Sequence, residues 1–362
     1  MSFSVIIGEV QQLDTPKFFD GHNDFLLHAD KRYFLERNEE GHLDIQRATE
    51  GGFFGGFFAV YVPQQGDGGP SSMMKGPILT SDGYEFEFAG PIDHEYALRF
   101  AEQRMEMLFQ IERDADGRFH VVRTVTEIEE CLGSDSIAAI LHFEGAEPIR
   151  EDLSNLETFY EQGLRSLGLV WSRPNIFGEG VPFKYPSSPD TGPGLTERGK
   201  ELVKELNRLG ILIDLSHLNE KGFWDVAALS DAPLVATHTA AHSICTKPRN
   251  LTDEQLDAVR ESGGVVGVNF AKYDLVSDGR IEGEVSLDEI AKHAEYIAER
   301  IGVECVALGS DFEGTRVPDD LADVTGLPKL AQALRKRGFD DASLKKIAHE
   351  NWIDVLKRTW KP

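Results

Sequence analysis

A histidine and an aspartate two residues apart follow an apolar run near the start of the chain. The run at 17–19 leads into the string DGHND at 20–24, which contains His22 and Asp24. In an extended strand, residues i and i+2 point to the same side, so these two side chains can reach one point in space. An imidazole together with a carboxylate is a ligand set that a divalent ion such as zinc accepts. The spacing therefore indicates a candidate metal site.

Other residues that could bind a metal or transfer a proton also stand at the ends of apolar runs. They are Glu144, His217, His238 and Asp311. Each has a simpler explanation when taken alone. A histidine after a strand is often a packed core residue, and an aspartate such as Asp214 or Asp311 often caps the following helix. Together with His22 and Asp24, however, the set is explained most simply by one shared site.

Eight apolar segments are predicted as the strands that must position these side chains. They cover residues 17–21, 51–62, 136–143, 164–171, 211–216, 233–237, 264–270 and 305–309. Most are followed by a segment with helical periodicity, such as 93–113, 155–162 and 196–209, the last with Thr196 as its N-cap. This alternation predicts an α/β fold, a (β/α)8 TIM-like barrel, in which functional groups gather at the carboxyl ends of the strands.

The organisation of the rest of the chain fits one barrel. No internal repeat or change in composition divides it, so we expect a single domain over residues 1–362. Two stretches rich in Gly and Pro, at 64–93 and 172–194, are predicted as long βα loops, and the length of the first is typical of a lid or an interface. The last fifty residues are predicted to form amphipathic helices.

Composition and charge exclude several classes of function. The 362 residues include 37 Lys and Arg against 62 Asp and Glu, a net charge of −25, which argues against nucleic acid and anionic membranes as partners. The three cysteines are widely spaced with no CxxC pair, which fits a reducing compartment. Residues 1–14 lack the pattern of a signal peptide, and no apolar stretch reaches the ~18 residues of a membrane span. We therefore expect a cytoplasmic protein.

Five strings in this sequence resemble those of the membrane dipeptidase (renal dipeptidase) family of zinc metallopeptidases, peptidase family M19. They are DGHND (20–24), HFEGAEP (142–148), LIDLSH (212–217), THTAAHSICTKPRN (237–250) and LGSDFEG (308–314), in the order and spacing of the family. The resemblance implies a (β/α)8 barrel with two zinc ions per chain. His22 and Asp24 would bind one ion, and Glu144 would bridge the two. His217 and His238 would bind the other ion.

The same resemblance implies a mechanism and a substrate class. A hydroxide held between the two ions would attack the peptide carbonyl. Asp311 matches the family's catalytic acid and would take the proton of the water and pass it to the leaving amine. Arg249 matches the family's arginine, whose guanidinium can hold a free carboxylate in two parallel bonds, which favours a dipeptide as substrate. A surface salt bridge is the alternative role for Arg249. The family also suggests a homodimer.

One position departs from the family pattern. The family usually has a histidine after the fourth strand, where it can help to stabilise the oxyanion, and Trp171 stands there in this sequence. An indole donates one hydrogen bond but cannot become a cation, and loss of one oxyanion donor can cost on the order of 10²–10³ in rate. Either Arg173, Asn175 or another residue of the long loop substitutes for it, or the substrate differs from ordinary dipeptides. We therefore expect Trp171 and Asn175 to contribute to substrate binding.

Two other functions stay open at this point. One is a binuclear-metal amidohydrolase that acts on another small amide, lactam or ester, for which Trp171 and the long loops leave room. The other is a non-catalytic descendant that binds a small ligand, although the complete ligand set and Asp311 argue against it. Glu144 as the bridging group, in place of a lysine available for carboxylation, favours the dipeptidase. Asp214 and His293 are expected to be supporting residues, the latter in packing.

Overall fold

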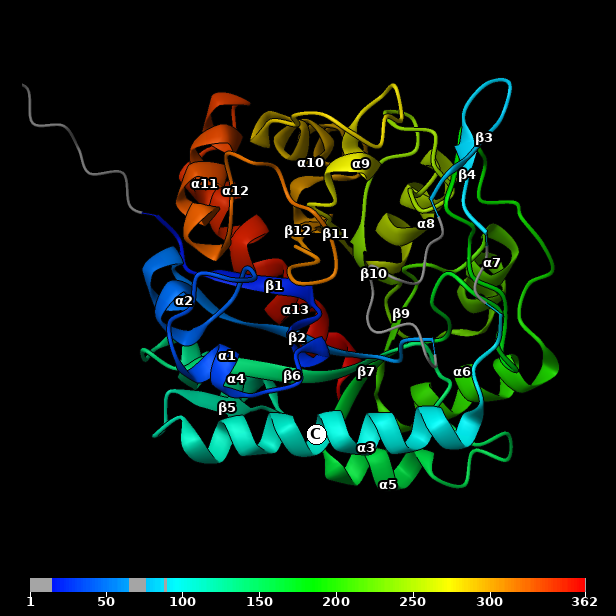
Figure 1. The fold of residues 1–362 in the computed structure, drawn as a ribbon, viewed down its shortest axis with the longest axis horizontal. Helices are drawn as coiled ribbons and strands as arrows, with labels where there is room; N and C mark the ends of the chain where they lie inside the picture. The colour runs from blue at the N-terminus through cyan, green and yellow to red at the C-terminus, as the bar shows by residue number, and fades with distance from the viewer. Residues whose placement is uncertain (1–14, 65–75, 88–89, 362) are drawn as a thin grey trace, which may run out of the picture.

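Eight parallel strands form a nearly closed barrel in the computed structural model, which describes residues 15–64, 76–87 and 90–361 (Figure 1). The strands follow one another around the sheet in chain order: β1 (Phe18–Asn23), β2 (Phe53–Tyr61), β6 (Ile137–Glu144), β7 (Leu164–Gly168), β9 (Leu212–Asp214), β10 (Val235–Thr239), β11 (Val265–Val268) and β12 (Val306–Leu308). Backbone hydrogen bonds join the first strand to the segment after the last, from Asp311 N to the carbonyl oxygen of His22 (3.0 Å) and from Asp24 N to that of Phe312 (2.8 Å). The predicted (β/α)8 fold is confirmed.

The strands differ from the prediction mainly at their ends. β7 ends at Gly168, so Trp171 lies in the following loop and not on the strand. β1 continues to Asn23 and therefore includes His22. A short additional strand, β5 (Phe119–Val121), was not predicted; it pairs with the start of β6, while β7 pairs with the later part of the same edge. With three residues and an exposed His120 at its centre, β5 has no apolar run that a sequence pattern could reveal.

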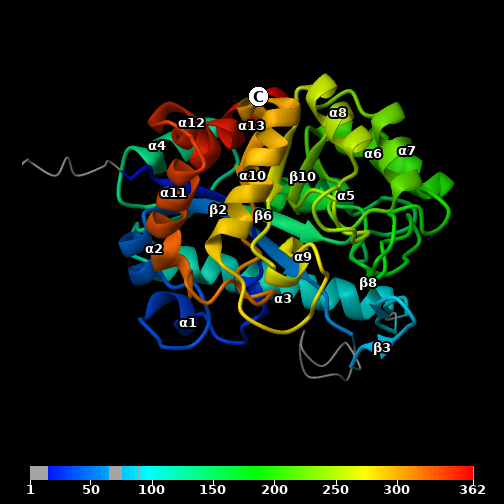
Figure 2. The same ribbon diagram turned by 90° about the horizontal axis from the view of Figure 1, so that it is seen from above.

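Helices surround the barrel strands (Figure 2). The longer ones are α3 (His94–Asp114), α4 (Val125–Leu132), α5 (Leu156–Gln162), α6 (Glu197–Leu209), α7 (Glu220–Leu229), α8 (Asp253–Ser262), α10 (Leu287–Ile301), α11 (Leu327–Lys336) and α13 (Asn351–Thr359). The shorter ones are α1 (Arg32–Leu35), α2 (Ile45–Gly51), α9 (Lys272–Leu275) and α12 (Asp341–Lys345). Thr196 caps α6 as predicted, because its side chain accepts a hydrogen bond from Gly199 N. None of the helices within the described ranges is both long and apolar enough to cross a bilayer.

The amino end of the barrel is closed by Trp352 of α13. This side chain is fully buried, packs against Phe57 with ring centroids 5.2 Å apart and donates a hydrogen bond to the carbonyl oxygen of Leu308 (3.0 Å). Gly21 permits this packing, because a Cβ there would lie 2.5 Å from the Trp352 ring and 2.3 Å from the carbonyl oxygen of Thr237. Apolar side chains thus fill this end of the barrel, and polar groups gather at the carboxyl ends of the strands.

The two predicted long loops form a small antiparallel sheet together. It contains β3 (Ile78–Leu79) and β4 (Tyr84–Glu85) from the first loop and β8 (Lys184–Tyr185) from the second. Tyr84 and Tyr185 anchor the sheet by donating hydrogen bonds to the carbonyl oxygens of Gly279 (2.7 Å) and Ser277 (2.8 Å). Residues 65–75 and 88–89 of the first loop lie outside the described residues. Residues 1–14, in which no signal peptide was expected, also lie outside them. The described parts of both loops therefore meet in one element.

Candidate active site

Glu144, the last residue of β6, lies between the other predicted metal ligands. Its Oε2 is 3.7 Å from Nε2 of His22, and its Oε1 is 2.9 Å from Nε2 of His217 and 3.6 Å from Nε2 of His238. The two oxygens of one carboxylate thus face two different groups of ligands. This is the arrangement that a bridging carboxylate requires.

The ligands on either side of Glu144 lie close to one another. His22 Nε2 is 3.6 Å from Oδ2 of Asp24, although Asp24 has left the extended conformation with φ −99° and ψ 26°. On the other side, Nε2 of His217 and Nε2 of His238 are 3.2 Å apart. His217 lies three residues beyond β9, with a φ of +67° that residues with side chains rarely adopt. The structure therefore brings all five predicted ligands together.

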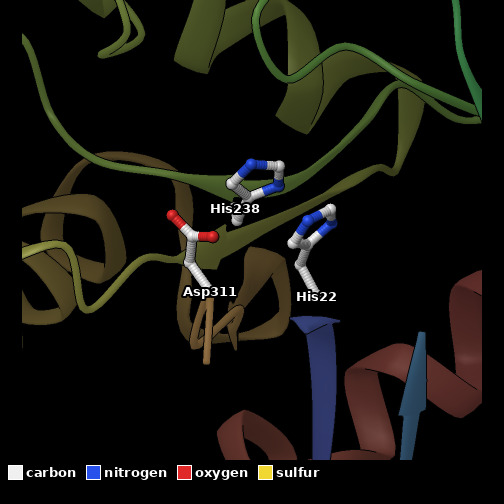
Figure 3. A group of neighbouring side chains, drawn as sticks. All are labelled: His22, His238 and Asp311. Carbon is white, nitrogen blue, oxygen red and sulfur yellow. The ribbon is translucent and has the colours of Figure 1, made fainter. Parts of the chain in front are cut away.

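Asp311 adjoins the same group from the segment that follows β12. Polar atoms of His22, His238 and Asp311 all lie within 4.8 Å of one another, and the three side chains converge in Figure 3. Asp311 has a φ of +58°. The neighbouring Ser310 fixes this turn, because its backbone N and its hydroxyl both donate to the carboxylate of Asp20 at 2.6 and 2.7 Å.

Burial leaves several of these polar groups without partners. His22 is 0% exposed, and neither of its ring nitrogens has a hydrogen-bond partner among the described residues. Burial, followed by the charge of Arg249, lowers the pKa of His217 to about 4, and burial also lowers the pKa of His238 well below its usual value. Neutral imidazoles have lone pairs available for a metal, and buried unpaired polar atoms are costly unless a ligand satisfies them. The donor set therefore fits two divalent ions, and zinc is well matched to it.

Burial has the opposite effect on Asp311. It raises the pKa of this carboxyl group well above its usual range, and the nearby carboxylate of Asp24 adds to the effect. A carboxyl group with a raised pKa keeps a proton that an ordinary aspartate would have lost, and it can pass that proton to a neighbouring group. The geometry is therefore suited to general acid–base chemistry.

A cavity of about 130 Å³ opens beside these groups. Its lining includes Tyr61, Glu144, Trp171, His217, Arg249 and Asp311. A larger pocket of about 630 Å³ shares Phe183, Arg249 and Asp274 with it, so Arg249 lies where the two spaces meet. Arg249 is 5% exposed; its Nη2 donates to the carbonyl oxygen of His238 (3.0 Å), and its Nη1 has no hydrogen-bond partner in the described part of the chain. A guanidinium nitrogen is thus available to an anionic ligand.

The two residues expected near Trp171 have different positions. The Trp171 ring lines the cavity, with centroids 5.7 Å from His217 and 5.1 Å from Tyr61. Asn175 is not among the residues that line it. Its Nδ2 donates to the carbonyl oxygen of Leu169 (2.9 Å), and its Oδ1 accepts from Phe177 N (2.8 Å). The expectation that Asn175 contacts substrate is therefore not supported, because its amide is used to hold the loop.

Arg173 is also placed away from the cavity lining. It is fully buried, and its guanidinium donates to Glu147 Oε1 (2.8 Å), to the carbonyl oxygen of Val62 (2.8 Å) and to the hydroxyl of Tyr61 (3.3 Å). Arg173 therefore lies behind Tyr61 and does not take the place of the family histidine directly.

Sequence reasoning missed several residues that support the site. Tyr61 ends β2 directly opposite Glu144 in the sheet register and lines the cavity. The hydroxyls of Ser172 and Thr237 lie 2.7 and 2.9 Å from Nδ1 of His217 and His238 respectively. Their only signal in the sequence is proximity to a predicted ligand or strand end, which many unrelated residues share.

Comparison with known proteins agrees with this geometry. The family model for membrane dipeptidase (peptidase family M19) matches residues 9–361. A metallo peptidase from Rhodobacter sphaeroides, solved with a phosphinate mimic of the dipeptide L-Ala-D-Ala, is 48% identical with a TM-score of 0.91, covering 96% of this chain and 100% of that one. The structure of the dipeptidase AC, of family M19, is 47% identical with a TM-score of 0.89, covering 96% and 99% of the two chains. The dipeptidase verJ of Clonostachys rogersoniana is 30% identical over 356 residues, 95% of this chain and 84% of the relative. The chain therefore belongs to the membrane dipeptidase family of metallopeptidases, peptidase family M19.

Proposed function

We propose that this protein is a zinc-dependent dipeptidase, which hydrolyses the peptide bond of dipeptides with a hydroxide that bridges two zinc ions. The observation that carries the proposal is the position of Glu144, whose two oxygens face separate ligand groups. His22 and Asp24 would hold one ion, and His217 and His238 the other. Zinc ions bound there supply Lewis-acid polarisation of the carbonyl and a hydroxide nucleophile at neutral pH.

The remaining groups of the cavity handle the proton and the substrate. A carboxylate oxygen of Asp311 takes the proton of the attacking water and delivers it to the nitrogen of the leaving amine. Arg249 binds the free carboxylate of the dipeptide through Nη1, which has no partner in the described part of the chain. Trp171 and Tyr61 form an aromatic wall beside His217 and exclude water from that side.

The relatives support the substrate class. The Rhodobacter protein was solved with a mimic of a dipeptide, and the Clonostachys relative is named a dipeptidase. A site closed at the base of a barrel and bounded by one guanidinium suits a short substrate with a free carboxylate. Cytoplasmic location and a homodimer stay predictions from the sequence.

Cleavage of a dipeptide panel tests the proposal. We expect the purified protein to release free amino acids from dipeptides, to stop after extensive chelation, and to recover when about two equivalents of zinc are restored. Dipeptide amides and small lactams serve as controls, because they lack the carboxylate or the linear peptide bond. The proposal fails if no dipeptide is cleaved in a metal-dependent manner, or if a lactam is clearly preferred. Metal analysis that saturates at one ion per chain would contradict the two-metal site.

A further inference from the structure

Asp214, at the end of β9, lies directly beneath the ligands of both proposed metal ions. It is 2% exposed. Its Oδ1 accepts hydrogen bonds from the backbone N of Ser216 (3.0 Å) and of Thr237 (2.8 Å), and its Oδ2 accepts from the hydroxyl of Thr237 (2.6 Å). The carboxylate is therefore held rigidly by groups on β10 and on the segment after β9.

The contact with Thr237 determines which nitrogen of His238 carries the proton. A carboxylate can only accept hydrogen bonds, so the single hydroxyl hydrogen of Thr237 is directed to Asp214. The oxygen of that hydroxyl lies 2.9 Å from Nδ1 of His238 and can then only accept from it. His238 must therefore carry its proton on Nδ1 and present the lone pair of Nε2 towards Glu144, which is what a metal ligand requires.

The same carboxylate faces a second histidine on the other side. Oδ2 of Asp214 lies 3.6 Å from Nε2 of His142, a fully buried residue of β6 whose Nδ1 is 2.9 Å from the hydroxyl of Ser166. Nε2 of His142 has no hydrogen-bond partner among the described residues, and neither has either nitrogen of His22. The rings of His22 and His142 meet edge to face with centroids 5.4 Å apart.

The unsatisfied nitrogens of His22 and His142 lie in one polar cluster with Asp214. Ligand atoms of His22, His142 and Asp214 lie within 4.8 Å of one another. A separation of 3.6 Å is too long for a direct hydrogen bond but can be closed by a shared water, and a buried water typically has about three polar partners. Because Nε2 of His22 faces Asp24 and Glu144, Nδ1 is the nitrogen left to donate to such a water, which could itself donate to Asp214 and to Nε2 of His142. His22 would then present the lone pair of Nε2, the nitrogen that faces Asp24 and Glu144.

We propose that Asp214 is a positioning residue for both metal sites: through Thr237 it sets the tautomer of His238, and through a buried water shared with His142 it sets that of His22. One carboxylate below the site thus fixes the tautomer of one histidine ligand of each ion. This inference rests on the proposed two-metal function, and it adds that the two ions share a support beneath the ligands as well as the bridge of Glu144. Groups that orient ligands in this way commonly contribute about 10- to 100-fold to metal affinity.

The contact of Asp214 with Thr237 and its contact with His142 can be removed separately. Thr237→Val removes the hydroxyl with little change in shape, and we expect one of the two zinc ions to bind about 10- to 100-fold more weakly. His142→Phe removes the other contact, and we expect the other ion to be weakened by a similar factor. The double variant and Asp214→Asn should weaken both ions. Zinc titration in competition with a chromophoric chelator measures each affinity without substrate.

Matched controls separate positioning from a general effect on folding. Thr239→Val makes the same change two residues along β10, where the hydroxyl donates to the carbonyl oxygen of Arg249 (2.8 Å), and it should leave both zinc affinities unchanged. Thr237→Ser keeps the hydroxyl and should restore the wild-type affinity. In the metal-free protein, NMR of the imidazole nitrogens should show His238 protonated on Nδ1, and Thr237→Val should abolish this preference.

The outcomes distinguish this inference from the function on which it rests. If the wild type binds two zinc ions and cleaves dipeptides, while Thr237→Val and His142→Phe bind both ions as the wild type does, the positioning role is refuted and the dipeptidase stands. If the wild type binds no divalent ion, both are refuted. If Asp214→Asn does not fold, the zinc affinities of Thr237→Val and His142→Phe still test the inference.

Discussion

Two residues of the site, His217 and Asp311, have positive φ angles of 67° and 58°. Side chains make this backbone conformation costly, and it persists only where the surrounding structure enforces it. For Asp311 the enforcing contacts are the hydrogen bond from its N to the carbonyl oxygen of His22 (3.0 Å) and the pairing of Ser310 with Asp20. The strain is therefore located at the two residues that turn side chains into the site.

Replacement of the proposed proton carrier should abolish turnover without loss of metal. Asp311→Asn keeps the size of the side chain but cannot exchange a proton, so we expect kcat for a dipeptide to fall by about 10²–10⁴. Zinc content, measured by element analysis, should stay at the wild-type value. Asp319→Asn, the same change at the exposed partner of Lys272, is the control and should be fully active. An active Asp311→Asn variant would refute the role in proton transfer.

Replacement of Arg249 should weaken recognition of the substrate carboxylate. A hydrogen bond to a charged group contributes about 1.5–3 kcal/mol, so Arg249→Met should raise KM for a dipeptide roughly 10- to 150-fold. KM for the corresponding dipeptide amide should change little, because it has no carboxylate to lose. Arg249→Lys keeps the charge, so its KM for the dipeptide should lie between that of the wild type and that of Arg249→Met. Equal effects on the dipeptide and its amide would show that Arg249 acts only through its bond to the carbonyl oxygen of His238.

At the scale of elements, a buried ion pair joins the loop after β7 to the loop after β6, and its arginine also bonds to the end of β2. Arg173 is fully buried and bonded to Glu147, to Val62 and to Tyr61, the last residue of β2. The guanidinium carbon also lies 5.2 Å from the ring centroids of both Tyr61 and Trp171. The ion pair therefore holds the aromatic wall of the cavity in place.

Removing one partner of this ion pair should lower the free energy of unfolding more than removing both charges. Arg173→Met leaves Glu147 buried without its cation and should lower the free energy of unfolding by about 3–5 kcal/mol. The double variant Arg173→Met/Glu147→Gln should recover a large part of that loss, since no uncompensated charge remains. Chemical denaturation of the wild type, both single variants and the double variant forms a complete cycle. Additive effects of the two changes would show that the pair is not coupled.

At the scale of the whole molecule, the proposed site links metal binding to global stability. The five ligands come from four strands or the segments that follow them, so ions bound there connect β1, β6, β9 and β10. Binding to the folded state alone stabilises it by about 2.7 kcal/mol when free zinc is 100 times Kd. Chelation should therefore lower Tm by roughly 3–4 °C for each ion removed, and zinc should restore it.

The control for this prediction is His238→Gln, which removes one ligand. Its Tm should be less sensitive to zinc than that of the wild type. An identical response of the two proteins to chelator and zinc would place the stabilising ions elsewhere. The expected single domain over residues 1–362 is consistent with one cooperative transition, which the same experiment monitors.

The sequence by itself determined the fold class, the family and the set of five candidate ligands with Asp311. Apolar runs that end in His, Asp or Glu identify strands of a barrel, and parallel strands place their carboxyl ends at one edge. These features depend on local pattern, which the sequence displays directly. The cap at Thr196 was predictable for the same reason.

Only the tertiary structure decided which neighbouring polar residues reach the site. Asn175 and Arg173 stand close to Trp171 in the chain, yet their polar groups are satisfied within the loop and behind Tyr61. Asp214, Thr237 and His142 acquire their roles through contacts between strands: the hydroxyl of Thr237 donates to Asp214 (2.6 Å), and Oδ2 of Asp214 lies 3.6 Å from Nε2 of His142. No spacing within one strand reveals such contacts. Side-chain partners across a barrel are set by register, twist and close packing of the whole sheet, which are properties of the assembled chain.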